Sequence, residues 1–256
     1  MSEIYKPTQQ ESLNLRTKDD FLKVSGDGIF VTRQGEGVTA GKDAVFIRLH
    51  FCNLACGRDG SWKCDTGYTW DKRDPRFWQE PYDLKISTAA TLIKDSWKEL
   101  DAERRLVVTG GEPMLQQKKI AELLKNLPGW TVEIETNGTI IPIADLSNCQ
   151  FNCSPKLSNS GNTLGRRYRP DVLRAIATLP NSWFKFVVTC PKDIQEIEKM
   201  VSECGILPEK VLIMPEGQTA ETVADGAWMI KELVIQKGWK LTMRNQLIWY
   251  GPKRRT

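Results

Sequence analysis

Three cysteines, Cys52, Cys56 and Cys64, stand close together in the segment FCNLACGRDGSWKCDTGYTW, with an Asp-Thr pair directly behind the third. Clustered thiolates of this kind are common metal ligands. The chain carries seven cysteines. An odd number without a visible export signal argues against a disulfide framework and for a reducing compartment. We therefore interpret this cluster first as a metal site.

Two kinds of metal site are compatible with this spacing. Zinc would need a fourth ligand, and the only histidine, His50, lies two residues before Cys52. Against zinc, His50 ends the apolar run AVFIRLH, where strand geometry would restrict its reach, and the chain shows no second cysteine pair with knuckle spacing. Alternatively, three thiolates can hold three irons of a four-iron, four-sulfur cluster and leave the fourth iron open.

The other cysteines are expected to be small buried hydrophobic residues rather than ligands. They are Cys149, Cys153, Cys190 and Cys204.

A second motif, TGGEP at 109–113, follows an apolar run. Its glycine pair would let backbone groups approach a ligand closely, and Glu112 supplies a carboxylate suited to an ammonium group. The alternative is an ordinary Gly-Gly turn, with Pro113 at the start of a helix. By itself the motif favours the turn, but together with the cysteine cluster one strand earlier it favours a ligand site.

The elements that must position these motifs alternate along the chain. Runs rich in β-branched and aromatic residues predict strands at 44–50, 105–110, 130–136, 149–154, 183–189, 210–215 and 239–243. Helical patterning falls between them, at 87–100, 116–127, 171–179, 194–204 and 219–238. This alternation predicts crossover units and a parallel α/β sheet, with the site at the C-terminal ends of its strands. An extra hairpin or strand is expected at 28–37.

The length of 256 residues, with 40% hydrophobic and 27% charged residues, fits one domain over 1–256, which we divide into an N-terminal extension (1–25) and a core (26–250). No apolar run is long enough to cross a bilayer, so we expect a soluble, cytoplasmic protein with no membrane partner. The net charge is +4, and basic residues gather at 165–169 and 253–255. We interpret both segments as solvated surface, with a phosphate-bearing partner as the alternative.

The order of the motifs resembles that of the radical S-adenosylmethionine superfamily, and their flanking residues resemble the 7-carboxy-7-deazaguanine synthase family over roughly residues 24–250. The motifs that carry the resemblance are QGEG (34–37), FIRL (46–49), CNL (52–54), CDTGYTW (64–70), TGGEP (109–113), ETNGT (135–139) and SPK (154–156). The resemblance implies a partial (β/α)6-type TIM barrel. It also implies conversion of 6-carboxy-5,6,7,8-tetrahydropterin to 7-carboxy-7-deazaguanine with loss of ammonia, on the route to queuosine.

The resemblance further implies a set of ligands and the residues that hold them. Cys52, Cys56 and Cys64 would hold a 4Fe-4S cluster, Thr66 would bind Mg²⁺, and no catalytic residue is implied beyond the cluster and S-adenosylmethionine. The residues implied for S-adenosylmethionine are Asp65, Gly110, Gly111, Glu112, Thr136, Asn137, Ser154, Lys156, Met214, Pro215 and Glu216. Those implied for the pterin are Gln34, Gly35, Glu36, Arg48 and Gly110.

Two of the implied pterin ligands have simpler interpretations. Arg48 would pair with the substrate carboxylate as a bidentate fork, but it could instead form an ion pair at an inward strand position. Glu36 could be a solvated turn residue. The resemblance also implies a homodimer, an electron donor such as a flavodoxin or ferredoxin, and no nucleic-acid partner.

The chain departs from the family pattern in three places. Seven residues, Gly57 to Lys63, separate the last two cysteines where the superfamily has two; Ile248 stands where we place a family histidine; and Arg33 replaces a usually apolar residue. Two other functions remain as alternatives. One is an activase that generates a glycyl radical on a partner protein, and the other is a zinc-stabilised protein that binds nucleic acid through its basic segments.

Overall fold

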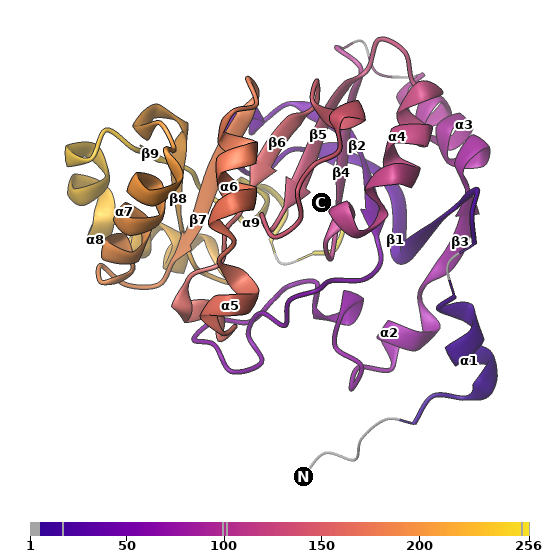
Figure 1. Cartoon of the computed structure of the whole chain (residues 1–256), viewed down its shortest axis with the longest axis horizontal. Helices are drawn as coiled ribbons and strands as arrows, with labels where there is room; N and C mark the ends of the chain where they lie inside the picture. The colour runs from indigo at the N-terminus through magenta and orange to yellow at the C-terminus, as the bar shows by residue number, and fades with distance from the viewer. Residues whose placement is uncertain (1–5, 17, 99, 101, 252, 256) are drawn as a thin grey trace.

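The computed structural model describes residues 6–16, 18–98, 100, 102–251 and 253–255. Parts of two predicted segments lie outside these described residues, namely 1–5 and 17 of the N-terminal extension and 99 of the helix at 87–100. The strands form one nine-stranded sheet in the order β3-β1-β2-β4-β5-β6-β7-β8-β9 (Figure 1). Its edges are β3 (Tyr82–Lys85) and β9 (Lys240–Leu241), so the sheet is an open, partial barrel.

Six consecutive strands form the parallel body of this barrel, and β9 adds a short seventh. They are β2 (Asp43–Leu49), β4 (Arg105–Gly110), β5 (Thr131–Thr136), β6 (Gln150–Cys153), β7 (Ser182–Val188) and β8 (Val211–Pro215). The prediction of a parallel α/β fold is therefore confirmed. The apolar runs identified these strands well because parallel strands are buried on both faces.

The extra hairpin or strand expected at 28–37 is a strand, β1, that begins earlier than expected. β1 (Phe21–Arg33) pairs antiparallel with β2 and with β3, and its register with β2 shifts between Val24 and Ile29. β1 therefore begins inside the segment 1–25 that we expected to precede the core. Leu22 and Val24 are fully buried there, which explains why this segment joins the sheet.

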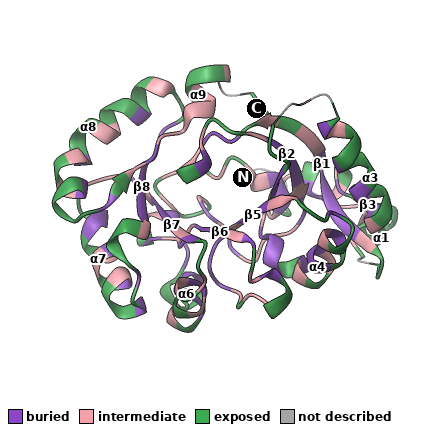
Figure 2. Ribbon diagram, turned by 90° about the horizontal axis from the view of Figure 1, so that it is seen from above, coloured by how far each residue is buried: buried purple, intermediate pink, exposed green. Residues whose placement is uncertain are grey.

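Helices cover the outer face of the sheet (Figures 1 and 2). The longer ones are α3 (Ile86–Trp97), α4 (Gln117–Lys125), α6 (Pro170–Ala177), α7 (Asp193–Cys204) and α8 (Ala220–Gln236). The short ones are α1 (Gln9–Asn14), α2 (Arg76–Gln79), α5 (Leu164–Arg167) and α9 (Asn245–Tyr250). Their apolar sides, for example Ile93, Ile120 and Ile197, pack with the strands into one core. Within the described part of the chain, no helix combines the length and apolar character needed to cross a bilayer.

The inner face of the sheet carries a buried polar cluster on β5, beside a small apolar cluster of Ala44, Phe46 and Val107. Side chains alternate along β5, so Val132 and Ile134 belong to the core while Glu133 and Glu135 face the other way. Glu133 is fully buried and lies 2.6 Å from Arg105. A buried charge is tolerated only when it is paired, so these polar side chains depend on one another. Nε2 of Gln34 donates to Glu133 at 3.5 Å, which connects this buried pair to the cavity described next.

Candidate active site

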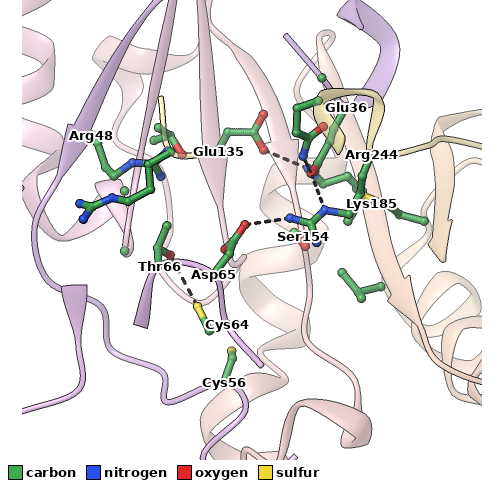
Figure 3. A pocket seen from close by; sticks show the side chains of 18 of the residues that line it. Glu36, Arg48, Cys56, Cys64, Asp65, Thr66, Glu135, Ser154, Lys185 and Arg244 are labelled. Atoms are coloured by element: carbon green, nitrogen blue, oxygen red, sulfur yellow. Dashed lines mark hydrogen bonds and ion pairs between the residues drawn. The ribbon is translucent and has the colours of Figure 1, made fainter. Parts of the chain in front are cut away.

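A cavity of about 400 Å³ opens at the C-terminal ends of the parallel strands. Predicted site residues that line it are Gln34, Gly35, Glu36, Arg48, Cys52, Cys56, Cys64, Asp65, Thr66, Gly110, Gly111, Thr136, Asn137, Ser154, Lys156, Met214 and Glu216. Glu112 and Pro215 are not among the lining residues. In Figure 3, Cys56 and Cys64 lie on one side of the cavity, and Glu36, Lys185 and Arg244 lie across from them.

The cysteine loop begins with a residue in an unusual backbone conformation. Phe51 has a φ of 82°, a left-handed value that is rare for a bulky residue and that turns the chain from β2 into Cys52. Its ring packs beside His50 and Phe77. His50 is fully buried against Phe77 and does not line the cavity. His50 therefore does not join the cysteines.

The cysteine cluster is also too spread out to bind a single metal ion such as zinc. Among the described residues, no three His, Cys, Asp or Glu side chains converge closely enough to hold one ion. Zinc needs its ligand atoms within about 2.3 Å of one point, whereas the ligands of a cubane cluster sit at separate corners. The three thiols on one cavity wall fit the cluster better than they fit zinc.

Each sulfur of this group has a hydrogen-bonding neighbour. The backbone N–H of Leu54 donates to Sγ of Cys52 at 3.5 Å, and Nδ2 of Asn162 donates to Sγ of Cys56 at 3.3 Å. The Thr66 hydroxyl lies 3.5 Å from Sγ of Cys64. Burial nevertheless raises the pKa of all three thiols, that of Cys52 to about 12. A metal group bound here must displace protons from these thiols.

The widened loop between Cys56 and Cys64 is docked against the turn that follows β6. The N–H of Gly57 donates to the carbonyl of Ser160 at 3.0 Å, and the indole N–H of Trp62 donates to Oδ1 of Asn159 at 2.9 Å. Gly60 lies so close that a Cβ there would be 2.6 Å from the Asn159 carbonyl oxygen. The extra residues therefore form a supported wall of the cavity, to which Trp62 and Lys63 contribute.

Part of the basic segment 165–169 contacts the cavity wall on either side of this loop. Arg166 donates to the carbonyl of Asn53 at 2.7 Å, and Arg167 donates to the carbonyl of Lys156 at 3.0 Å. Arg167 is buried and pairs with Glu196. Our interpretation of this segment as solvated surface is wrong for Arg167, because its charge is used inside the fold.

The glycine pair brings two strand ends together. Gly110 has a φ of 144°, and a Cβ on it would lie 2.1 Å from the carbonyl oxygen of Leu49. A Cβ on Gly111 would lie 2.2 Å from the carbonyl oxygen of Phe51. Only glycine fits so close to a neighbouring backbone. These residues hold β4 against the segment that enters the cysteine loop, and both also line the cavity.

Glu112 is fully buried behind this wall. Its carboxylate accepts hydrogen bonds from the N–H of Asn137 at 2.6 Å, the N–H of Met114 at 3.0 Å and the hydroxyl of Thr136 at 2.8 Å. Burial raises its pKa, and these donors oppose that effect. In this structure Glu112 braces the turn after β5, whose residues Thr136 and Asn137 line the cavity.

A charged cluster faces the cysteines. Oε2 of Glu36 lies 2.6 Å from Nζ of Lys185, and Oε1 accepts a 2.6 Å hydrogen bond from Gln246. Lys185 also lies 3.3 Å from Glu135, and Arg244 lies 3.5 Å from Glu36. Burial alone would raise the pKa of Glu36, but the charges of Lys185 and Arg244 outweigh it and lower that pKa to about 2. Glu36 is thus an ionised carboxylate inside the cavity, not a solvated turn residue.

Lys185, Glu135, Arg244 and Gln246 were missed by the sequence reasoning. Two of them carried a signal: Lys185 is the only charged residue in the apolar run WFKFVV, and Glu135 alternates with apolar residues along β5. A charge inside a buried strand needs a partner, and that partner is often part of a site.

The C-terminal segment also contributes residues to the cavity. Ile248, placed where the family has a histidine, is 55% exposed and does not line the cavity, whereas Gln246 does. Arg244 connects this segment to the cysteine loop, since Nη2 lies 3.0 Å from Oδ2 of Asp65. Arg33 lines the cavity rim, 3.2 Å from Asp43.

Two further predicted groups have clear positions. Lys156 donates from Nζ to the carbonyl and the hydroxyl of Ser154, at 2.8 and 2.7 Å. Arg48 lies 2.7 Å from Asp27, so it forms the ion pair considered as its simpler interpretation while still lining the cavity.

Known proteins share these features of the sequence and fold. Over 230 residues the chain is 32% identical to the 7-carboxy-7-deazaguanine synthase of Pyrobaculum aerophilum, covering 88% of this chain and 94% of that protein. The chain belongs to the 7-carboxy-7-deazaguanine synthase family. A 7-carboxy-7-deazaguanine synthase from Rhodopirellula baltica is also 32% identical, over 89% of this chain and 86% of the relative. No model of a protein family matches the chain.

A solved structure of the same family supports the fold. The crystal structure of QueE from Escherichia coli superposes with a TM-score of 0.65 at 22% identity, over 89% of this chain and 99% of that one. The predicted partial barrel is therefore confirmed. Membership of the 7-carboxy-7-deazaguanine synthase family favours the synthase over the activase and the zinc-stabilised binding protein.

Proposed function

We propose that the protein converts 6-carboxy-5,6,7,8-tetrahydropterin to 7-carboxy-7-deazaguanine with loss of ammonia, as a radical S-adenosylmethionine lyase of queuosine and 7-deazaguanine biosynthesis. One observation carries this proposal. The three thiols and the Glu36–Lys185 pair line opposite sides of the same cavity. The cavity volume of about 400 Å³ falls within the usual range for small-molecule sites.

Cys52, Cys56 and Cys64 would hold a 4Fe-4S cluster. The fit rests on their common wall and on the hydrogen-bond donors near each sulfur. The cluster and S-adenosylmethionine together supply one-electron chemistry when they are bound, and a flavodoxin or ferredoxin would supply the electron.

The chain's own residues would orient the cofactor beside this loop. Gly110 and Gly111 present backbone groups with no side chain in the way, and Asn137, Ser154 and Lys156 place polar groups on the neighbouring strand ends. Glu112 would act indirectly in this arrangement, by fixing the turn that carries Asn137. The other cofactor residues we propose are Asp65, Thr136, Met214, Pro215 and Glu216.

The opposite wall would bind the pterin. Ionised Glu36 can accept two hydrogen bonds from the amino-pyrimidine edge of a pterin, a bidentate arrangement that strengthens and orients binding. Arg48 would meet the substrate carboxylate, with Gln34 and Gly35 beside it. Thr66 would bind Mg²⁺, whose remaining ligands would be substrate oxygens and water. We also propose a cytoplasmic homodimer.

The test is anaerobic purification with iron and sulfide analysis, followed by incubation with 6-carboxytetrahydropterin, S-adenosylmethionine, Mg²⁺ and a reductant. We expect a brown protein that forms 7-carboxy-7-deazaguanine, loss of iron in Cys52→Ala, and normal iron in the matched variant Cys190→Ala, whose thiol lies outside the cavity lining. A cluster-loaded protein that cleaves S-adenosylmethionine without forming the deazapurine would refute the substrate. Normal iron in Cys52→Ala would refute the cluster site.

A further inference from the structure

The basic segment 253–255, interpreted from the sequence as solvated surface, belongs to the cavity. Lys253, Arg254 and Arg255 all line it. After α9 the chain returns to β1, where Nη2 of Arg255 donates to the carbonyl of Gly26 at 2.7 Å. We call these three residues the basic arm.

The basic arm contacts a buried carboxylate on β1. Asp27 is 3% exposed and lies where the β1–β2 register shifts. Its Oδ1 is 2.7 Å from Nη2 of Arg254 and 3.9 Å from Nε of Arg255, and its Oδ2 is 2.7 Å from Nε of Arg48. The hydroxyl of Tyr68 also donates to Oδ2.

Arg254 is fixed in this position from several directions. It pairs with Glu80 at 3.0 Å, and its guanidinium lies 4.2 Å from the centre of the Tyr68 ring. The hydrogen bonds to Glu80 raise the pKa of Arg254, so it keeps its charge at any working pH. The basic arm is therefore built into the wall rather than loosely placed over it.

The charges here do not balance. Asp27 and Glu80 supply two negative charges, whereas the arginines that contact them, Arg48, Arg254 and Arg255, supply three positive ones. If Arg48 were the only partner of Asp27, the two would form a closed neutral pair, and Arg48 would attract an anion weakly. Because Arg254 also neutralises Asp27, the positive charge of Arg48 remains available to a ligand in the cavity.

We propose that the basic arm is a specificity device: Arg254 neutralises Asp27 and thereby leaves Arg48 charged toward the acidic group of the substrate. Arg254 is a positioning residue in this arrangement. The inference rests on the proposed function, since it concerns the carboxylate that distinguishes 6-carboxytetrahydropterin from uncharged pterins.

The test compares two stable pterins that differ in charge. The affinities of the holoprotein for 6-carboxypterin and 6-hydroxymethylpterin are measured by equilibrium dialysis. In Arg254→Gln we expect about tenfold weaker binding of 6-carboxypterin, as is typical for removal of a nearby charge, and little change for 6-hydroxymethylpterin. Arg254→Lys should restore most of the loss. The KM for 6-carboxytetrahydropterin should rise in parallel while kcat and the KM for S-adenosylmethionine stay near their original values.

Two further variants separate this role from a general loss of charge or structure. Lys94→Gln removes one positive charge from the exposed side of α3 and should change neither affinity. In an Asp27→Asn background there is no carboxylate to neutralise, so adding Arg254→Gln should no longer weaken 6-carboxypterin binding. If Arg254→Gln alone does not fold, weaker 6-carboxypterin binding on its addition to Asp27→Asn would still overturn the inference.

Three results would overturn the inference. Equal weakening of both pterins in Arg254→Gln would assign the basic arm a purely structural role. If Arg254→Gln weakened 6-carboxypterin binding just as much in the Asp27→Asn background, Arg254 would not act by neutralising Asp27. If the unmodified holoprotein bound neither pterin, the proposed function would itself fail and this inference with it.

Discussion

Nζ of Lys185 lies 2.6 Å from Oε2 of Glu36, and the two residues are separated by 149 positions in the sequence. One belongs to β7 and the other to the turn between β1 and β2, so the pair spans the inner face of the sheet. Burial would lower the pKa of Lys185, but the charges of Glu135 and Glu36 outweigh it and raise that pKa. Each residue keeps the other charged.

Replacing Lys185 should impair substrate binding through Glu36. In Lys185→Met, Glu36 loses its main positive neighbour, so burial will raise the pKa of its carboxyl group. We expect a tenfold or larger rise in the KM for 6-carboxytetrahydropterin, on the order of 1.4 kcal/mol or more. We also expect the acid limb of kcat/KM against pH to move upward. An unchanged acid limb would contradict this role.

Glu36 should also contribute to stability in a defined pH range. Its folded pKa of about 2 lies below its ordinary value of 4.5, so its contribution is complete above pH 4.5 and is lost as the pH falls through 2. The shift corresponds to roughly 3 kcal/mol of unfolding free energy. Urea unfolding between pH 7 and 2.5 should show a weaker acid dependence in Glu36→Gln than in the parent protein. Glu122→Gln, an exposed change on α4, should keep the parental dependence.

Glu112→Gln tests whether this carboxylate braces the turn after β5. The two carboxylate oxygens of Glu112 accept hydrogen bonds from two backbone N–H groups and one hydroxyl. In the glutamine variant an NH2 group replaces one of these oxygens and would face a donor instead of accepting from it. We expect a loss of about 2 kcal/mol in unfolding free energy, because a buried donor is left unsatisfied. Weaker S-adenosylmethionine binding should accompany it. Parental stability in this variant would show that the brace is dispensable.

Gly60→Ala tests the docking of the widened cysteine loop. A Cβ at this position would lie 2.6 Å from the backbone of Asn159 and Ser160, so the loop must move away. We expect a lower iron content after anaerobic reconstitution and faster loss of iron to a chelator. Gly165→Ala, where a Cβ would have no neighbour within 4 Å, is the matched control and should load iron normally. Equal iron retention in the two variants would argue against a role for loop docking.

The sheet and the cysteine group could be predicted from the sequence because their signals are local. β4 (Arg105–Gly110) was predicted with its observed bounds, since a short apolar run ending in glycine marks a buried strand and its turn. The three cysteines stand within one short segment, so their proximity could be predicted without knowing the fold.

The charged side of the cavity depends on long-range pairing and could not be predicted in the same way. The partner of Glu36 is a lysine from β7, and the carboxylate of Asp27 meets arginines from the other end of the chain. The contribution of Arg244 and Gln246 to this cavity could not be predicted from the sequence either. Arg244, at the start of α9, is held by Asp65, Glu36 and the carbonyl of Gly217, which all lie elsewhere in the sequence.

The docking of the cysteine loop has a consequence for protein synthesis. Asn162, which donates to Cys56, comes 106 residues later in the chain, as part of the turn that supports Gly57 and Trp62. When the cysteines leave the ribosome, their support has not yet been translated. Iron and sulfide delivered at that moment would meet an unsupported loop. Cofactor insertion is therefore expected to follow completion of at least the first six strands, which makes it a late step in the maturation of the enzyme.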